Sequence, residues 1–432
     1  MTTAMAGEAP AAAQTDNAEL LECMLKIGKG LLASGSAVGV VENALTKIAM
    51  TYEVESEVVA LPNVLMLKLG ESIYELTDFA VQRSTSLPLN QFSALLEVID
   101  DLTRGRISPR EASARVDHVR ALGPRFSAIL VVVAYVISII GLTLRFRPDL
   151  QAVSVTATAG LFVALLVLAF SKWPRFNLLL PVIASILVST VIFNLTQAGW
   201  VYGAANLIIP PLIMFLPGAT LTTGMIELAS MNLISGSSRL MYGAATLFLL
   251  FIGIAVGLNI SNLPRTMVSS YEAAWFPWWA PLLGTILFGV GTFIRLSGSN
   301  RDLWWMLLVL FIAMIAQTVG ESLFNPYFGA FLGATFMALS SEIIGRSPRR
   351  TPALVSQQLA FWFLVPGARG LLSVTRILSQ DYTSAMIGLG EMVVLITAIA
   401  LGVFLGSLVV SPDKFVPISP RRASPPDKRS QA

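Results

Sequence analysis

From Arg125 onward the chain is a series of apolar stretches, each long enough or nearly long enough to cross a membrane. A membrane-spanning helix needs about 20 such residues. The 432-residue chain is 55% hydrophobic and 13% charged, which gives more apolar surface than a soluble domain can bury. We therefore predict a polytopic α-helical membrane protein. Its ten expected transmembrane helices cover residues 126–144, 151–170, 177–195, 201–218, 240–258, 278–296, 303–320, 325–344, 353–372 and 384–410.

Two of these stretches are interrupted by the tripeptide Pro-Gly-Ala, at Pro217 and again at Pro366. Proline removes a backbone donor and glycine relaxes the backbone, so each break leaves polar backbone groups unpaired. At membrane depth such groups are tolerated only when they are buried in protein or line a water-filled cavity. Paired interruptions in two halves of a chain are typical of a transporter's binding site.

The two breaks belong to a longer internal repeat. The tripeptides lie 149 residues apart (366 − 217), and Gly253-x-x-x-Gly257 recurs at the same offset as Gly402-x-x-x-Gly406. Five spans per half is an odd number, so the second copy must enter the membrane from the opposite side. The sequence thus predicts two inverted five-helix repeats.

Basic residues in the short loops set the expected orientation. With the N-terminus inside, eight Lys and Arg residues fall in cytoplasmic connections and four on the other side. The outer four are Arg145, Arg147, Arg265 and Arg376, and Arg239 and Arg295 are counted with the inner eight. This bias favours a multi-pass protein of the cell (plasma or inner) membrane with both termini in the cytoplasm.

Three carboxylates are the candidates for proton coupling: Glu227, Glu391 and Glu321. An ionisable group inside a bilayer is costly and is by default a functional candidate. Glu227 follows the first break by ten residues, and the offset of 149 relates it to Arg376, so the two could form a central ion pair. The alternative places both in exposed loops, and Glu321 could sit in headgroup water at a span end.

The segment after the first break is the candidate substrate site. A helix that restarts at Ala219 would aim free N–H groups and its positive dipole end at an anionic group such as a carboxylate. Threonine hydroxyls nearby suit a small polar ligand, although small residues also serve close helix packing. Whether residues 219–238 re-enter the membrane is left open. The predicted substrate-binding set is Pro217, Gly218, Ala219, Thr220, Thr222, Thr223, Asn232, Pro366, Gly367 and Arg376.

Ahead of the spans, residues 17–124 are expected to form a small cytoplasmic α+β domain. Helical periodicity favours four helices, with Ser36 capping the second. Between the helix pairs, two β-rich segments suggest a hairpin with Gly70 at its turn. The expected organisation is a disordered tail over 1–16, this domain, membrane repeats over 125–258 and 259–410, and a disordered basic tail over 411–432.

Several functional classes are disfavoured. The single cysteine, Cys23, excludes an internal disulfide or cysteine cluster, and the single histidine, His118, excludes a histidine pair in the membrane. No nucleotide-binding loop or metalloprotease motif is present. We expect no cofactor, no metal and no nucleic-acid partner. The expected partners are a small amino acid, protons and the lipid bilayer, and the sequence leaves open whether the chain forms a homo-oligomer.

A resemblance adds to these inferences. It is carried in the first domain by SGSAVGVVENALTKIA (34–49) and ISPREASARV (107–116), and in the membrane part by PPLIMFLPGATLTTGMIELASMNLISGSSRL (210–240) and RSPRRTPALVSQQLAFWFLVPGARGL (346–371). Together these blocks resemble the threonine/serine exporter (ThrE) family over nearly the whole chain outside the tails. The resemblance implies a cytoplasmic domain, ten spans, and export of small hydroxy amino acids using the proton gradient. Some members of that family are split into two chains at the join between the halves.

The leading hypothesis is a secondary exporter of small neutral amino acids, threonine or serine, that is driven by protons and is not an enzyme. The alternative is a membrane-anchored signalling or partner-binding protein whose soluble domain carries the activity. Two Pro-Gly interruptions and embedded carboxylates have no use in a pure anchor, and they favour the first hypothesis.

Overall fold

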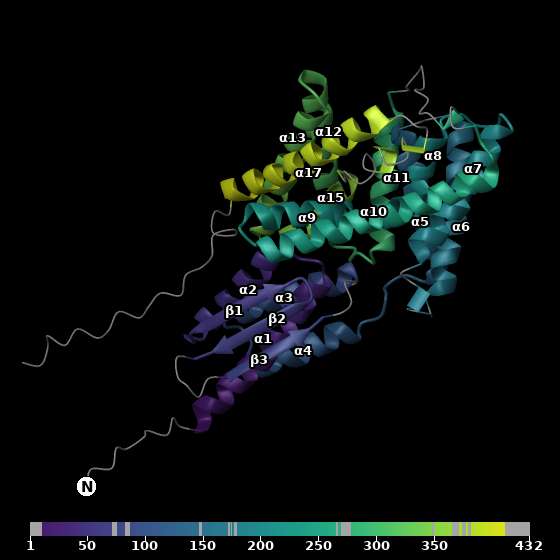
Figure 1. The fold of residues 1–432 in the computed structure, drawn as a ribbon. Coiled ribbons are helices and arrows are strands. Elements are labelled where there is room, and N and C mark those ends of the chain that lie inside the picture. Colours follow the sequence, from purple (N-terminus) through teal and green to yellow (C-terminus); the bar gives the residue numbers. More distant parts are fainter. Residues whose placement is uncertain are drawn as a thin grey trace, which may run out of the picture. The chain divides into compact units, whose positions relative to one another are not determined.

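The computed structural model (Figure 1) describes most of the chain between residues 11 and 410. The residues outside the description are 1–10, 71–75, 83–86, 147–148, 172, 174, 177–178, 265–266, 269–277, 348–349, 365–370, 374–376, 379–381 and 411–432. The chain divides into two compact units. The described residues of the first lie within 11–86 and 95–121, and those of the second within 87–94 and 122–410.

The first unit is a helical layer on a small sheet. Its helices are α1 (Ala11–Ala33), α2 (Val38–Thr51), α3 (Leu89–Thr103) and α4 (Pro109–Ala121), and the start of α3 is grouped with the second unit. Helix α1 packs against α2, α4 and strands β2 and β3. It begins at Ala11, inside the stretch that the sequence assigned to a tail. The N-cap of α2 is Ala37 rather than the predicted Ser36, whose hydroxyl instead pairs with that of Ser34.

The sheet differs from the predicted two-strand hairpin. It has three antiparallel strands in the order β1 (Ser56–Leu61), β2 (Val64–Leu69) and β3 (Leu76–Val81). The first turn is made by Pro62-Asn63, which joins two strands that the sequence had merged into one. Gly70 follows β2 with a φ of 105°, a left-handed conformation that glycine adopts freely. Pro-Asn is a common turn dipeptide, so the signal for the missed turn was present.

Strand alternation gives this sheet one buried face. Leu65, Leu67 and Leu69 of β2 are at most 2% exposed, whereas Met66 between them is 49% exposed. The covering helix α1 contributes Met24 and Cys23, both fully buried. Burial raises the pKa of the Cys23 thiol to about 11, because desolvation disfavours the thiolate.

The second unit is helical throughout its described part. Its elements are α5 (Ala128–Phe146), α6 (Leu150–Phe170), α7 (Leu180–Gln197), α8 (Ala204–Leu212), the 3₁₀ turn η2 (Ile213–Phe215), α9 (Gly218–Ala229), α10 (Leu233–Ser261), α11 (Ala280–Arg295), α12 (Leu303–Leu323), α13 (Pro326–Gly345), α14 (Ala353–Ser356), α15 (Gln358–Phe363) and α17 (Tyr382–Val410).

Seven of the described helices are long and apolar enough to cross a membrane, and eight spans result if the bent pair α8–η2 plus α9 counts as one. Helix α11, at 16 residues, is apolar but shorter. The expected span over 353–372 begins as two short helices, α14 and α15, and its later part lies mostly outside the described residues. The structure therefore supports a multi-pass membrane protein.

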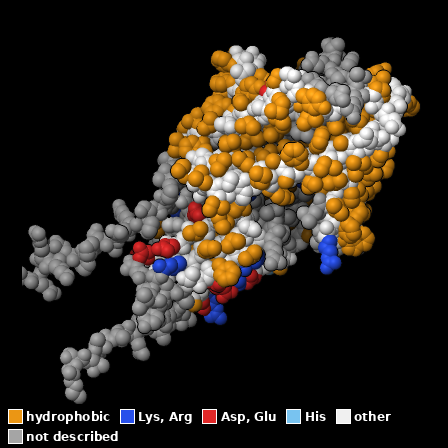
Figure 2. Space-filling view, in the orientation of Figure 1, with side chains coloured by type: hydrophobic (Ala, Val, Ile, Leu, Met, Phe, Trp, Pro, Cys, Tyr) orange, Lys and Arg blue, Asp and Glu red, His pale blue; other side chains and the backbone are white. Residues whose placement is uncertain are grey.

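Many apolar side chains lie on the face of this unit that Figure 2 shows. Leu150, Ile129 and Phe162 are 83%, 76% and 62% exposed, which is costly in water and favourable in lipid. The tryptophans gather at helix ends, as an aromatic belt would. Those that are more than 40% exposed near a helix end are Trp173, Trp200, Trp278, Trp279 and Trp304.

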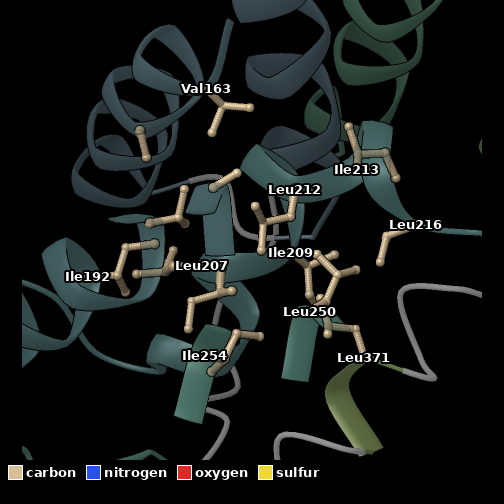
Figure 3. Close-up of a cluster of buried hydrophobic side chains, with 14 of the residues drawn as sticks. Val163, Ile192, Leu207, Ile209, Leu212, Ile213, Leu216, Leu250, Ile254 and Leu371 are labelled. Atoms are coloured by element: carbon tan, nitrogen blue, oxygen red, sulfur yellow. The ribbon is translucent and has the colours of Figure 1, made fainter. Parts of the chain in front are cut away.

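Short helix α8 forms the core of the unit. Apart from Asn206, its residues are all buried, as expected for a helix that is apolar on every side. Figure 3 shows Leu207, Ile209 and Leu212 of this helix surrounded by Ile192 of α7 and Ile254 of α10. Leu371, from the second half of the chain, joins the same cluster. The helix that leads to the predicted first break thus lies in a buried hydrophobic cluster.

Two long helices occupy matching places in the two halves. Helices α10 and α17 both have 29 residues, and they start 149 residues apart (382 − 233). Helix α10 packs on α7, and α17 packs on α13. Glycines permit both contacts, since a Cβ on Gly253 would lie 1.9 Å from Ser185 Oγ and one on Gly406 would lie 2.2 Å from the Thr335 carbonyl oxygen.

The halves also meet directly where α5 crosses α11. A Cβ added to Gly141 would lie 2.4 Å from the Phe288 amide nitrogen, and one added to Gly291 would lie 2.4 Å from the Ala134 carbonyl oxygen. Residue numbers rise along α5 as they fall along α11, so the two helices are antiparallel. Backbones this close leave no room for larger side chains.

This crossing predicts the effect of one added methyl group. Gly141→Ala should lower the free energy of unfolding by about 1–3 kcal/mol, because the new Cβ overlaps backbone atoms that cannot move aside. Gly390→Ala is the matched control, since a Cβ there meets nothing within 4 Å and should add up to about 1 kcal/mol of helix propensity. Thermal unfolding of the detergent-purified protein measures both. Equal melting temperatures for the two variants would contradict the close crossing.

Candidate functional site

The break after α8 is formed by prolines and completed by a distant tyrosine. Pro210 and Pro211 lie inside α8, and the chain passes through η2 before α9 starts at Gly218 with Pro217 as its N-cap. The two helical parts are bent by 67°. At this end of α8 the buried Tyr135 hydroxyl of α5 donates to the Pro211 carbonyl at 2.7 Å.

The start of α9 is mostly enclosed. Pro217 and Gly218 are buried and Thr222 is 1% exposed, whereas Ala219, Thr220 and Thr223 are partly exposed. Helix α9 packs against α10, α15 and α17, so elements of both halves surround it. Its free N–H groups are therefore held in a protein environment, as the sequence reasoning required.

The remaining predicted ligands are not gathered at this point. Asn232 precedes α10 at the far end of the 12-residue helix α9, about 18 Å along the axis from Gly218. Pro366, Gly367 and Arg376 lie outside the described residues. Substrate binding by these residues stays a prediction.

Glu227 lies deep in the unit and pairs with an arginine of its own half. It is 1% exposed, and Arg239 Nε of α10 donates to Glu227 Oε1 at 3.1 Å and lies 3.0 Å from Oε2. The side chain of Arg239 is 11% exposed. The structure gives the carboxylate this partner within the same half. Its expected partner Arg376 lies outside the described residues.

Local geometry brings this pair together. Helices α9 and α10 fold back on each other through a tight turn in which Met231 has a φ of 65° and the Asn232 amide donates to the Glu227 carbonyl at 2.8 Å. Gly224 and Gly236 face each other, because a Cβ on Gly236 would lie 2.7 Å from the Gly224 carbonyl oxygen. The close approach places Glu227 and Arg239 at hydrogen-bonding distance.

A second polar chain joins α5 to α12. Arg145 Nη2 donates to Gln317 Oε1 at 3.2 Å, and Gln317 Nε2 donates to Glu321 Oε1 at 2.8 Å. The guanidinium of Arg145 also lies 4.2 Å from the ring centroid of Phe363 on α15. Glu321 is thus connected to an arginine of the other half through one neutral amide.

Helix α15 carries a second arginine contact. The guanidinium of Arg295, at the end of α11, lies 5.2 Å from the ring centroid of Trp362. The neighbouring Phe363 packs on Phe288 of α11, with ring centroids 5.6 Å apart. Cation–π contacts of this kind gain strength where water is scarce.

Glu391 is partly exposed on α17, and it makes no hydrogen bond or ion pair in the part of the chain that the structure describes. The three predicted proton carriers therefore sit in three different surroundings. Glu227 is ion-paired and buried, Glu321 accepts from a neutral amide, and Glu391 has no partner among the described residues.

Two family models match different parts of this chain. The family model described as "Putative threonine/serine exporter" matches residues 22–261, and that described as "Threonine/Serine exporter, ThrE" matches residues 281–409. The chain belongs to the threonine/serine exporter (ThrE) family. The resemblance drawn from the sequence blocks is confirmed.

Two curated relatives of this ThrE-family chain are fungal. Both are named "Pheromone-regulated membrane protein 10". The one from Debaryomyces hansenii is 23% identical over 243 residues, which are 55% of the chain and 24% of that relative. The one from Eremothecium gossypii is 22% identical over 298 residues, which are 66% of the chain and 39% of that relative. The chain thus spans well under half of their length. No solved structure matches it significantly.

Sequence reasoning missed several polar residues of this ThrE-family chain. Tyr135 was not singled out, and Arg145, Arg239 and Arg295 were counted only as loop charges that set the orientation. One signal was available for two of them, since Arg145 and Arg295 are 150 residues apart, close to the repeat offset (295 − 145).

The Glu227–Arg239 pair predicts a strong energetic coupling. Glu227→Leu and Arg239→Leu should each destabilise the protein by about 3 kcal/mol, because each leaves a buried charge without its partner. The double variant should lose much less stability than the sum of the losses in the two single variants. Melting temperatures of the wild type and the three variants in detergent provide this double-mutant cycle. Glu391→Gln is a carboxylate control that should leave the melting temperature near the wild-type value. Additive losses would show that the ion pair is not formed.

Proposed function

We propose that this ThrE-family chain exports small neutral amino acids, threonine or serine, by alternating access coupled to inward proton flow. It would act in the plasma or inner membrane with both termini in the cytoplasm. The observation that carries the proposal is the relation between the halves. Helix α8 and the short helices α14–α15 are related by the repeat offset (204 + 149 = 353), and the first helices of the two halves, α5 and α11, cross antiparallel.

An inverted repeat has a functional consequence. Two halves with opposite orientation give one structure that can open to either side by exchanging the conformations of its halves. The antiparallel crossing of α5 and α11 and the equal lengths of α10 and α17 support this relation. Substrate would bind between the halves, where α9 of the first half contacts α15 and α17 of the second.

The start of α9 suits the substrate's carboxylate. Free N–H groups at Ala219 and beyond, with the positive end of the helix dipole, favour an anion. The partly exposed hydroxyls of Thr220 and Thr223 are suitable partners for the ammonium or hydroxyl group of a small amino acid.

Glu227 is the proposed proton carrier that controls the conformation. While it is ionised, it holds Arg239 and fixes α9 against α10. Protonation removes the charge, weakens the pair and frees α9 to move. Glu321 and Glu391 are the other candidates, and the same experiment compares all three.

The test is uptake by proteoliposomes with an acidic lumen. Protons leaving down their gradient should drive labelled threonine inward, and accumulation should disappear when an uncoupler removes the gradient or when its direction is reversed. Replacement of the proton carrier by glutamine, as in Glu227→Gln, should abolish gradient-driven accumulation. The Glu391→Gln and Glu321→Gln variants are measured in parallel.

Each result decides one part of the proposal. Uptake that is independent of the gradient would contradict proton coupling, and accumulation left intact in Glu227→Gln would remove that residue from the mechanism. Absence of any saturable uptake of threonine or serine by the folded wild-type protein would contradict transport, and would favour a signalling or partner-binding role.

A further inference from the structure

The helix crossing at the centre of the membrane unit relates two arginines that the proposed mechanism does not use. Gly141 of α5 contacts Gly284 of α11, and Gly291 of α11 contacts Ala134 of α5. Each residue of one contact lies 150 residues from its counterpart in the other (291 − 141 and 284 − 134). The crossing is therefore reciprocal, as contacts about a two-fold axis are. Arg145 and Arg295 are also 150 residues apart, so this axis relates them.

The two arginines start from opposite ends of the α5–α11 crossing, and both contact the short helix α15. Each lies in the last turn of its helix, and helical side chains lean toward the helix N-terminus. Because α5 and α11 are antiparallel, these last turns lie at opposite ends of the crossing, and both side chains lean back toward its middle. They end on adjacent residues of α15, Arg145 over Phe363 and Arg295 over Trp362.

Neither guanidinium forms a direct ion pair with a carboxylate in the part of the chain that the structure describes. Arg145 donates one hydrogen bond, to the neutral Gln317, and interacts with Glu321 only at longer range, whereas Arg295 has its ring contact and an electrostatic interaction with Tyr135. By contrast, Arg239 has its buried partner Glu227. A guanidinium has five N–H donors in a planar fork that matches a carboxylate. Each of these partly buried arginines therefore has N–H donors that no described residue uses, and such donors suit an anion.

We propose that Arg145 and Arg295 bind the carboxylate of the transported amino acid as it enters, each from one side of the membrane, before the carboxylate reaches the start of α9. The rings of Phe363 and Trp362 hold each guanidinium when no substrate is bound. A carboxylate that enters from one side accepts hydrogen bonds from the guanidinium on that side. Because α15 contacts both arginines, binding at one arginine can change the position of the other. This inference rests on the proposed export of amino acids and adds to it the residues that recognise the carboxylate.

The orientation expected from loop charges gives each arginine a side. Arg145 lies at the expected outer end of the first span, whereas Arg295 lies at the expected cytoplasmic end of the sixth. Arg295 should therefore govern substrate entering from the cytoplasm, and Arg145 substrate entering from outside.

The test compares threonine with threoninamide, which lacks the negative charge. In wild-type vesicles, threoninamide should compete with labelled threonine much more weakly than unlabelled threonine does. Arg295→Gln should raise the KM for threonine presented on the cytoplasmic face about 10- to 100-fold, the loss expected for a charged hydrogen-bonded pair, and should change inhibition by threoninamide less than about threefold. Arg145→Gln should do the same for threonine presented on the opposite face.

Arg350 provides the matched control. Its guanidinium lies 4.8 Å from the ring centroid of Trp305, a similar cation–π contact outside the crossing. Arg350→Gln should leave both the KM and the preference for threonine over threoninamide unchanged. Arg295→Lys should keep part of the preference, because it keeps the charge and loses the fork.

The outcomes separate this inference from the function on which it rests. If wild-type protein transports threonine but Arg295→Gln and Arg145→Gln weaken threonine and threoninamide equally, the arginines are structural and the inference is overturned. The same holds if the preference for the carboxylate persists in both variants. If wild-type protein transports no amino acid, the proposed function fails first, and carboxylate recognition fails with it.

Discussion

Backbone polar groups inside an apolar surrounding must find partners within the protein, and this requirement governs the rest of the membrane unit. Helix α8 contains two prolines and ends after nine residues, so it cannot be placed against lipid without loss. The fold surrounds it with α5, α6 and α7 and supplies the Tyr135 hydroxyl of α5 to the Pro211 carbonyl. An interrupted helix is thus tolerated because the long helices take the lipid-facing positions.

Close packing then decides where polar side chains can meet. Glycines at the α5–α11 crossing and at the α9–α10 turn bring backbones within contact distance. The first contact relates the two halves of the chain, and the second places Glu227 beside Arg239. Charges that would be costly in an apolar environment are accommodated by an ion pair, a neutral amide or an aromatic face. These three arrangements differ in how readily a proton or a ligand can disturb them, and the proposed mechanism depends on that difference.

Much of this architecture follows from local sequence signals. Apolar stretches gave the membrane class, Pro-Gly gave the bend before α9, and quoted sequence blocks gave the family. The contacts between polar side chains could not be predicted in the same way. Glu227 meets Arg239, twelve residues further along, only because a turn with a positive φ at Met231 folds α10 back on α9. Arg145 and Arg295 lie at helix ends. At such positions the sequence alone does not distinguish an arginine in the lipid headgroup region from one whose side chain points into the protein. The turn at Pro62-Asn63 is a different case. Its dipeptide is a recognisable turn signal, but the prediction treated the residues on both sides of it as one strand.

The two halves are expected to enter the membrane in opposite orientations, and labelling of single introduced cysteines measures this directly. Gln151 is exposed at the start of α6, and Asn300, 149 residues later, is exposed in the turn just before α12. The native Cys23 is fully buried with its thiol pKa raised to about 11, so it stays silent at neutral pH. A membrane-impermeant maleimide should label Gln151→Cys in intact cells and Asn300→Cys only after permeabilisation. Labelling of both from the same side would contradict the inverted arrangement.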